Sequence, residues 1–350
     1  MYIAGRNREK EDVVYVLEGG LNAPARTSIF TGARGCGKTA LLTYLAAEAQ
    51  QRGWICANTS CIAGMQEDIL QQAAVSAENL VPAEKSRHLK ALSIGQLIGV
   101  EWDNDEKTKA NWRTRITKLL EALNEEGAGL LITIDEVDPN LDEMIQIASV
   151  YQLLIRENRK VALLMAGLLS KVSALLRGDA VSFLRRSSQY TLGSIGDYDA
   201  EFAVRKTIED SDRRIDDDAL KYAVSKIGGY PYMLQLVGFH SWNEANGKDS
   251  ISIDDVRRGA ATAQREFEDR IIKTTLSELS DRDIEFLKAM AEDDDTSRVS
   301  DIEKRMGKPS GYISQYRNRL IEGGVIEPAG RGKLIFSLPG LKDYLRSENA

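Results

Sequence analysis

Cysteine and histidine are scarce in this chain. The 350 residues include three cysteines, Cys36, Cys56 and Cys61, and two histidines, His88 and His240. An odd, small number of cysteines is typical of a protein from a reducing compartment and argues against a disulfide framework. The two histidines are far apart in the sequence, so a zinc site made of cysteine and histidine ligands is not expected.

Long apolar runs are also missing. The longest, residues 161–169, is far too short to span a bilayer, and charged residues crowd positions 6–12, where a secretory signal would need apolar ones. We therefore expect a cytoplasmic protein without a membrane segment. The net charge of -7 argues against a protein that coats nucleic acid with its whole surface, although it allows a local basic surface. The length predicts two or three globular domains.

The most informative stretch has the pattern G-x-x-x-x-G-K-T. It follows a β-forming run at 27–30 and precedes a helical segment at 40–47, which is the context that a phosphate-binding loop requires. Its glycines permit left-handed backbone conformations, so that the N–H groups can converge on a phosphate, and the following helix adds its dipole. The predicted nucleotide-binding residues in this stretch are Gly32, Ala33, Arg34, Gly35, Cys36, Gly37, Lys38, Thr39 and Ala40.

A second chemical signal follows the apolar run 130–134, which predicts a strand buried on both faces, as in a parallel sheet. Asp135 and Glu136 come at its carboxyl end, where such sheets bind ligands. We expect Asp135 and Thr39 to hold Mg²⁺ and Lys38 to lie between the β- and γ-phosphates. Glu136 is predicted to polarise the water that attacks the γ-phosphate.

The pattern of elements changes twice along the chain. Alternating strands and helices predict a doubly wound, parallel-sheet α/β core of the P-loop NTPase kind in residues 1–195, with a surface excursion at 78–110. Residues 196–276 are predicted to form an all-α lid with helices at 199–210, 216–226, 232–245 and 253–275. Residues 277–350 combine three helices, at 281–292, 299–306 and 311–322, with a β-hairpin of strands 323–328 and 333–338, which predicts a winged-helix domain.

The predicted winged helix contains a local excess of positive charge. Between Lys304 and Lys333 there are seven Lys or Arg residues and two acidic ones. This excess favours duplex DNA as a partner, with contact by the winged helix to a protein as the alternative. The candidate DNA contacts are Lys308, Ser310, Tyr312, Ser314, Gln315, Arg317, Arg319 and Arg331.

Several motifs together resemble a known group of proteins. They are Gly5-Arg6, GARGCGKT, ITIDEVD, Arg185-Arg186, a Gly-Gly-Tyr-Pro segment at 228–231 and the terminal winged helix. Along the whole chain they are similar to AAA+ ATPases of the origin-recognition or initiator type, and to the neighbouring archaeal-type and STAND ATPases.

The resemblance implies ATP and Mg²⁺ as cofactors, with Arg6 near the adenine and ribose. Arg185 or Arg186 would act as an arginine finger on a neighbouring subunit, which implies a homo-oligomer. Pro231 stands where many AAA+ lids carry a sensor arginine, and it resembles the Gly-x-Pro element of STAND proteins, which packs on the base. The position of the other AAA+ sensor, 165–167, is apolar. Both departures favour a slow, nucleotide-controlled switch.

The leading hypothesis is an ATP-hydrolysing AAA+ protein that couples its nucleotide state and self-assembly to duplex DNA binding. One alternative is a STAND-like regulatory switch whose winged helix contacts protein. Another is a nucleotide binder without hydrolysis. GTP stays open as a substrate, although the guanine-specific N-K-x-D motif does not occur in the sequence.

Overall fold

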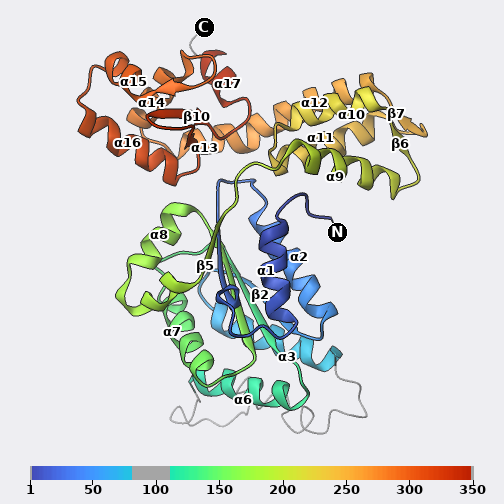
Figure 1. The fold of residues 1–350 in the computed structure, drawn as a ribbon, viewed down its shortest axis with the longest axis vertical. Coiled ribbons are helices and arrows are strands. Elements are labelled where there is room, and N and C mark those ends of the chain that lie inside the picture. Colours follow the sequence, from blue (N-terminus) through green and yellow to red (C-terminus); the bar gives the residue numbers. More distant parts are fainter. Residues whose placement is uncertain (1, 81–110, 348–350) are drawn as a thin grey trace.

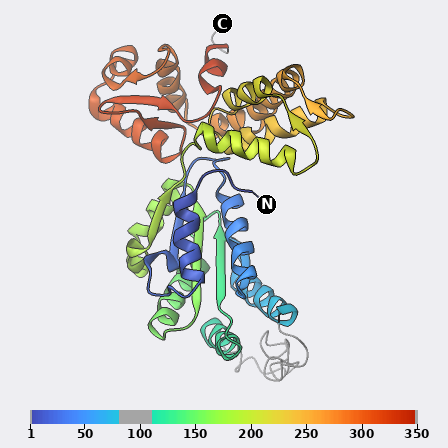
Figure 2. The same ribbon diagram turned by 45° about the vertical axis from the view of Figure 1, so that its right-hand side comes forward.

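The computed structural model describes residues 2–80 and 111–347. The surface excursion predicted for residues 78–110 lies outside the described residues from position 81 onward, as does His88. An α/β core forms one end of the molecule, and two mainly helical units lie side by side on the other (Figure 1, Figure 2). None of the described helices is both long and apolar enough to cross a membrane.

The core is built on one five-stranded parallel sheet with the order β2-β3-β4-β1-β5. Its strands are β1 (Thr27–Thr31), β2 (Ile55–Ser60), β3 (Leu130–Asp135), β4 (Val161–Gly167) and β5 (Ser188–Thr191). The strands β1 and β4 are buried along their whole length, as their apolar runs predict for a sheet covered on both faces.

Helices cover both faces of this sheet. They are α1 (Asn7–Leu17), α2 (Lys38–Gln51), α3 (Met65–Leu80), α6 (Trp112–Glu125), α7 (Asp142–Arg156), α8 (Leu169–Arg177) and the 3₁₀ segment η2 (Asp179–Arg186). Successive strand residues point to opposite faces: Ile29 packs in the cluster with α3, α6 and α7, and Phe30 in the cluster with α1 and α2. The predicted doubly wound α/β fold is confirmed.

The lid consists of α9 (Asp197–Glu209), α10 (Asp217–Ile227), α11 (Pro231–Glu244) and α12 (Ile253–Phe267). A capping box of Ser252 and Asp255 starts α12. Two very short strands, β6 (Arg214–Ile215) and β7 (Ser250–Ile251), pair in parallel. They were not predicted, because two residues show no periodic pattern. The single helix predicted for 253–275 continues through a π-helical turn, η3 (Glu268–Ile272), into α13 (Lys273–Ser277).

The C-terminal unit comprises residues 281–347. Its elements are α14 (Asp281–Ala291), β8 (Ser297–Arg298), α15 (Val299–Met306), α16 (Ser310–Glu322), β9 (Ile326–Pro328), β10 (Lys333–Phe336) and α17 (Leu341–Ser347). The three helices and the hairpin occur where they were predicted. The pattern missed α17 and also β8, whose two residues complete an antiparallel sheet of order β8-β10-β9.

One continuous hydrophobic core joins the lid to the C-terminal unit. It runs from Ile195 through Phe267 and Ile272 to Phe286 and Leu345. The helix α13 crosses the predicted boundary at 276/277 without any break in this core. The limits of the lid and of the third domain therefore stay a prediction.

Candidate nucleotide-binding site

The predicted phosphate loop connects β1 to α2 at the carboxyl edge of the sheet. Gly35 and Gly37 have φ angles of 73° and 92°, in the left-handed region that glycine adopts without strain. A methyl side chain at Gly32 would lie 2.5 Å from Cys36 Sγ. The loop therefore needs glycine at these positions for its tight path.

Lys38 and Thr39 begin α2 and point at the mouth of the loop. The buried Lys38 Nζ donates hydrogen bonds to the carbonyls of Gly32 (3.1 Å) and Ala33 (2.9 Å). Thr39 Oγ1 donates to Asp135 Oδ2 at 2.5 Å, which joins the start of α2 to the end of β3. The two motifs predicted to form one site thus lie in contact.

The hydroxyl of Thr39 and the carboxylate of Asp135 are the oxygen ligands that Mg²⁺ prefers. Among the described residues, no group of three or more His, Cys, Asp or Glu could hold a metal ion without other ligands. Mg²⁺ typically binds through one or two such protein oxygens together with substrate phosphates. The pair therefore fits a magnesium ion that is bound together with a nucleotide.

Glu136 follows β3 with an unusual backbone. Its φ angle is 56°, a left-handed conformation that costs a non-glycine residue about 1–2 kcal/mol. Hydrogen bonds on both sides hold it: the Glu136 N–H donates to Asp135 Oδ1 at 2.9 Å, and the Val137 N–H donates to the Ala166 carbonyl at 2.9 Å. The side chain is exposed. Strain of this kind is common where a side chain must be aimed for function.

Arg6, predicted to lie near the adenine and ribose, donates from Nη2 to the carbonyls of Cys36 (3.3 Å) and Gly193. Burial lowers the pKa of this guanidinium. Arg6 therefore ties the phosphate loop to the segment between β5 and α9. Its contact with a nucleotide stays a prediction.

The lid closes over the loop through the Gly-Gly-Tyr-Pro segment. Pro231 packs on Gly37, where a methyl side chain would lie 3.5 Å from its Cβ. The Tyr232 N–H donates to the Gly35 carbonyl at 3.1 Å, and the Tyr230 hydroxyl donates to the Arg34 carbonyl. Burial raises the pKa of Tyr230, so its hydroxyl keeps the proton that it donates. Contact of Pro231 with a nucleotide stays a prediction, and no role was predicted for either tyrosine from the sequence.

The C-terminal unit also contacts the loop. Gly324 lies so close to Ala33 that a methyl side chain on the glycine would come within 2.8 Å of the alanine Cα. Arg34 Nη2 and Glu278 Oε1, on the turn after α13, form an ion pair of 2.8 Å with side chains 45% and 52% exposed. These contacts have no signal in the sequence, because the two partners of each are more than 200 residues apart.

The two candidate finger arginines differ in their surroundings. Arg185 donates to the carbonyls of Leu176 (2.7 Å) and Arg177 (3.4 Å), at the end of α8. Arg186 is exposed, and within the described part of the chain no hydrogen bond or ion pair engages its side chain. The apolar sensor position at 165–167 is fully buried at the end of β4.

The candidate DNA contacts lie in the turn before α16, on different faces of α16 and on the hairpin. Arg319 donates to Asp283 Oδ1 (2.9 Å) and Ser280 Oγ (2.9 Å) at the start of α14. The Tyr312 ring packs on the Tyr316 ring, with 4.7 Å between the ring centroids. Arg317 lines a hollow with the hairpin, including Lys333. The remaining candidates are exposed or half-buried: Lys308, Ser310, Ser314, Gln315 and Arg331.

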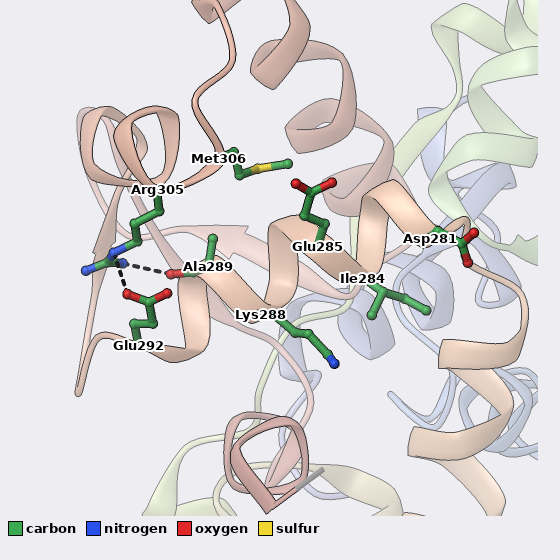
Figure 3. A pocket seen from close by; sticks show the side chains of 8 residues that line it. All are labelled: Asp281, Ile284, Glu285, Lys288, Ala289, Glu292, Arg305 and Met306. Carbon is green, nitrogen blue, oxygen red and sulfur yellow. Dashed lines mark hydrogen bonds and ion pairs between the residues drawn. The ribbon is translucent and has the colours of Figure 1, made fainter. Parts of the chain in front are cut away.

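Ion pairs reduce the positive charge that this unit can offer. A cavity of about 440 Å³ between α14 and α15 is lined by acidic and basic side chains (Figure 3). On its rim the Arg305 guanidinium pairs with Glu292 and Asp293 and donates to the Ala289 carbonyl. Among the described basic residues from Lys304 to Lys333, those without an acidic partner are Lys308, Arg317, Arg331 and Lys333.

The parallel strand order, the loop between β1 and α2 and the carboxylates at the end of β3 make up an α/β fold that solved Walker-type and ORC/Cdc6-like ATPase structures share. The fold is similar to that of the Walker-type ATPase PABY2304 of Pyrococcus abyssi, at a TM-score of 0.65 and 14% identity, covering 98% of this chain and 96% of that chain. It is equally similar to the ORC2 protein of Aeropyrum pernix in ADPNP–ADP complexes (TM-score 0.65, 15% identity, 99% and 94% covered).

A third solved structure, Cdc6p from Pyrobaculum aerophilum, matches with a TM-score of 0.50 and 15% identity over 100% of this chain and 96% of that chain. Residues 269–345 match a family model described as Domain of unknown function (DUF8462). A search of curated proteins finds no match. At these identities the solved structures establish the fold.

Proposed function

We propose that the protein binds ATP with Mg²⁺ and hydrolyses it. The observation that carries this proposal is the contact between Thr39 and Asp135, with Lys38 and Glu136 beside it. When bound, Mg²⁺ would be held by Thr39 and Asp135 and would neutralise charge on the phosphates. Lys38 supplies a further positive charge there. The Glu136 carboxylate accepts a proton from the attacking water as the bond between the γ-phosphorus and the bridging oxygen breaks, giving ADP and phosphate.

We further propose that self-assembly completes this site. Arg186 is exposed, and its guanidinium has no partner in the described part of the chain, so it can reach a neighbouring subunit. Arg185 is less suited because its guanidinium is bound to the end of α8. A finger that arrives from another subunit makes hydrolysis depend on assembly.

The C-terminal unit is proposed to act as a winged helix that binds duplex DNA. Recognition helices contact base edges with their N-terminal residues, and Ser310 and Gln315 are exposed in this half of α16. Arg317, Arg331 and Lys333 would contact phosphates from the helix and the hairpin. Arg319 is better explained as a structural residue, because it binds the nearly buried Asp283.

The full proposal is tested by measuring ATP turnover against protein concentration, with and without duplex DNA, at two salt concentrations. A rate per subunit that rises with concentration, and rises further with DNA at low salt, is the expected result. A flat rate close to zero, despite tight ATP binding, would contradict coupling to assembly and DNA.

Arg317→Ala is expected to weaken DNA binding, because one phosphate contact is lost. The plot of the logarithm of the DNA association constant against the logarithm of the salt concentration should become less steep, by about 1. The measurement is a titration of labelled duplex at several salt concentrations. Lys118→Ala is the control, because it removes one positive charge from the exposed face of α6, in the core. Equal slopes for Arg317→Ala and the parent protein would argue for a protein partner.

A second candidate function is a nucleotide-controlled switch whose C-terminal unit contacts protein. It is favoured by the position of this unit on the phosphate loop, through Gly324 on Ala33 and through Glu278 on Arg34. In this proposal, the nucleotide state of the loop controls whether the C-terminal unit stays in place.

Gly324→Ala is expected to loosen this contact, because the added methyl would overlap the backbone of Ala33. We expect release of a fluorescent ADP analogue to become about tenfold faster, corresponding to ~1.4 kcal/mol. Gly307→Ala is a matched control: Gly307 also has a positive φ (59°) in the same unit, but no atom lies within 4 Å of the added methyl. If Gly324→Ala and Gly307→Ala release the analogue at the same rate, the contact between Gly324 and Ala33 does not control nucleotide release.

A further inference from the structure

An ion pair connects the phosphate loop to the turn after α13. Arg34 Nη2 lies 2.8 Å from Glu278 Oε1, and in the described part of the chain no other ion pair links residues 2–195 to residues 197–347. We propose that Arg34 leaves Glu278 to bind the γ-phosphate of ATP, so that this pair of side chains distinguishes ATP from ADP. The inference rests on the proposed ATP binding and names the side chain that senses the third phosphate.

The ion pair lies at the end of the loop where the γ-phosphate is expected. Arg34 and Glu278 border a cavity of about 320 Å³ whose walls also include Leu168 and Ser170. These two residues come just after β4, and β4 lies beside β3, which ends at Asp135. Because Mg²⁺ bridges the β- and γ-phosphates, and Asp135 is its predicted ligand, the third phosphate is expected on this side of the loop.

The core presents a single charged side chain to the opposite wall. Cavities of about 320 and 260 Å³ lie between the loop and the C-terminal unit, and Arg34 is the only Lys, Arg, Asp or Glu that the core contributes to their described lining. The opposite wall carries four carboxylates and one guanidinium. They belong to Glu278, Asp283, Glu322, Glu327 and Arg319. An acidic wall therefore faces a loop whose N–H groups are arranged to bind anions.

Arg34 can exchange partners by turning its side chain alone. The Tyr230 hydroxyl donates to the Arg34 carbonyl, and the Tyr232 N–H donates to the Gly35 carbonyl at 3.1 Å, so the backbone of the loop is held in place. The side chains of Arg34 and Glu278 are both about half exposed, and ion pairs of such exposure are weak. A phosphate is the stronger partner, because a guanidinium can donate two parallel hydrogen bonds to it.

A γ-phosphate at this place also repels the acidic wall. The side chains of Glu322 and Glu327 have no hydrogen bond or ion pair with any described residue. Once Arg34 has turned to the phosphate, repulsion from these carboxylates opposes the contact of Gly324 with Ala33. The effect is reciprocal: the contact lowers the affinity for ATP by the same factor by which ATP weakens the contact. ADP lacks the third phosphate and leaves the ion pair intact.

The experiment compares ADP with the β,γ-imido analogue of ATP, both with Mg²⁺, by calorimetry on the full-length protein. Arg34→Gln should raise the Kd of the analogue about tenfold and leave the Kd of ADP within about twofold. Glu278→Gln should lower the Kd of the analogue about fivefold, because Arg34 loses its competing partner, again with little effect on ADP. If either variant changes both Kd values by the same factor, or changes neither, the inference is overturned.

The double variant tests whether the two side chains act on each other. In the Arg34→Gln background, Glu278→Gln should change the ratio of the two Kd values by less than about twofold, since the carboxylate has no arginine left to hold. The effect of Glu278→Gln alone should shrink at high salt, which screens an exposed ion pair. Effects that simply add in the double variant would contradict a shared role.

Glu285→Gln is the matched control. Glu285 pairs with Arg282 at 2.6 Å within α14 and lines the cavity between α14 and α15, away from the phosphate loop (Figure 3). This variant should keep the ratio of the parent protein, and a shift as large as that of Glu278→Gln would mean that only the total charge matters. If the parent protein binds neither ligand, the proposed function itself fails, and this outcome is distinct from the others.

Discussion

Replacement of Glu136 by glutamine is expected to lower ATP turnover by about 10²–10⁴-fold, because an amide cannot accept the proton of the attacking water. ATP binding should stay, since Lys38, Thr39 and Asp135 form the contacts expected at the phosphates and are unchanged. The left-handed backbone at residue 136 is held by hydrogen bonds of the Glu136 and Val137 N–H groups to the Asp135 carboxylate and the Ala166 carbonyl, which glutamine keeps. Single-turnover hydrolysis and calorimetric binding of ATP measure the two effects separately.

Asp138→Asn is the matched control for this variant. Asp138 lies on the same loop, but its carboxylate pairs with Lys171 at 3.2 Å and accepts the Asn140 N–H at 2.9 Å, away from the Thr39–Asp135 contact. Its turnover should stay close to that of the parent protein. If the parent protein binds ATP but shows no turnover above Glu136→Gln, the chain is a nucleotide binder without hydrolysis.

Arg186→Ala is expected to have an equally large effect, but only in the assembled protein. Loss of an arginine finger lowers turnover by about 10³–10⁵-fold. Arg185→Ala is the matched variant. It removes the hydrogen bond to the Leu176 carbonyl, so we expect it to lower the melting temperature and to leave turnover close to that of the parent protein. The rates are measured above and below the protein concentration at which subunits associate.

Mixing two inactive variants decides whether the finger acts between subunits. Glu136→Gln subunits keep Arg186, and Arg186→Ala subunits keep Glu136. An equimolar mixture should therefore recover part of the turnover, because some sites combine an intact base with an intact finger. A mixture as inactive as each variant alone would exclude this role for Arg186 in trans.

The parts of the fold that were predicted correctly depend on neighbours in the sequence. The strand–loop–helix around Gly32 to Thr39 and the helix at 299–306 each follow from local patterns of apolar residues and glycines. The short strands β6, β7 and β8 did not, since two residues carry no periodicity and form only because a partner strand lies beside them.

The candidate site divides in the same way. Residues of the two motifs come together as predicted, because the carboxyl ends of parallel strands meet at one edge of the sheet. The contacts made by Arg34 and Arg319 were not predicted, because the sequence shows an arginine's charge and not its partner. The partners are Glu278 for Arg34 and Asp283 for Arg319, so Arg319 links α16 to the start of α14.

The continuous core that joins the lid to the C-terminal unit has a mechanical consequence. Phe267, Ile272 and Phe286 share that core with Tyr230 of the segment over the phosphate loop and with Ile313 and Leu320 of α16. Because such a core is close-packed, a displacement of the Tyr230–Pro231 segment would be transmitted to α16 through packed side chains. The same feature makes the C-terminal unit unsuitable for expression on its own, since cutting at 276 would expose apolar side chains on both fragments.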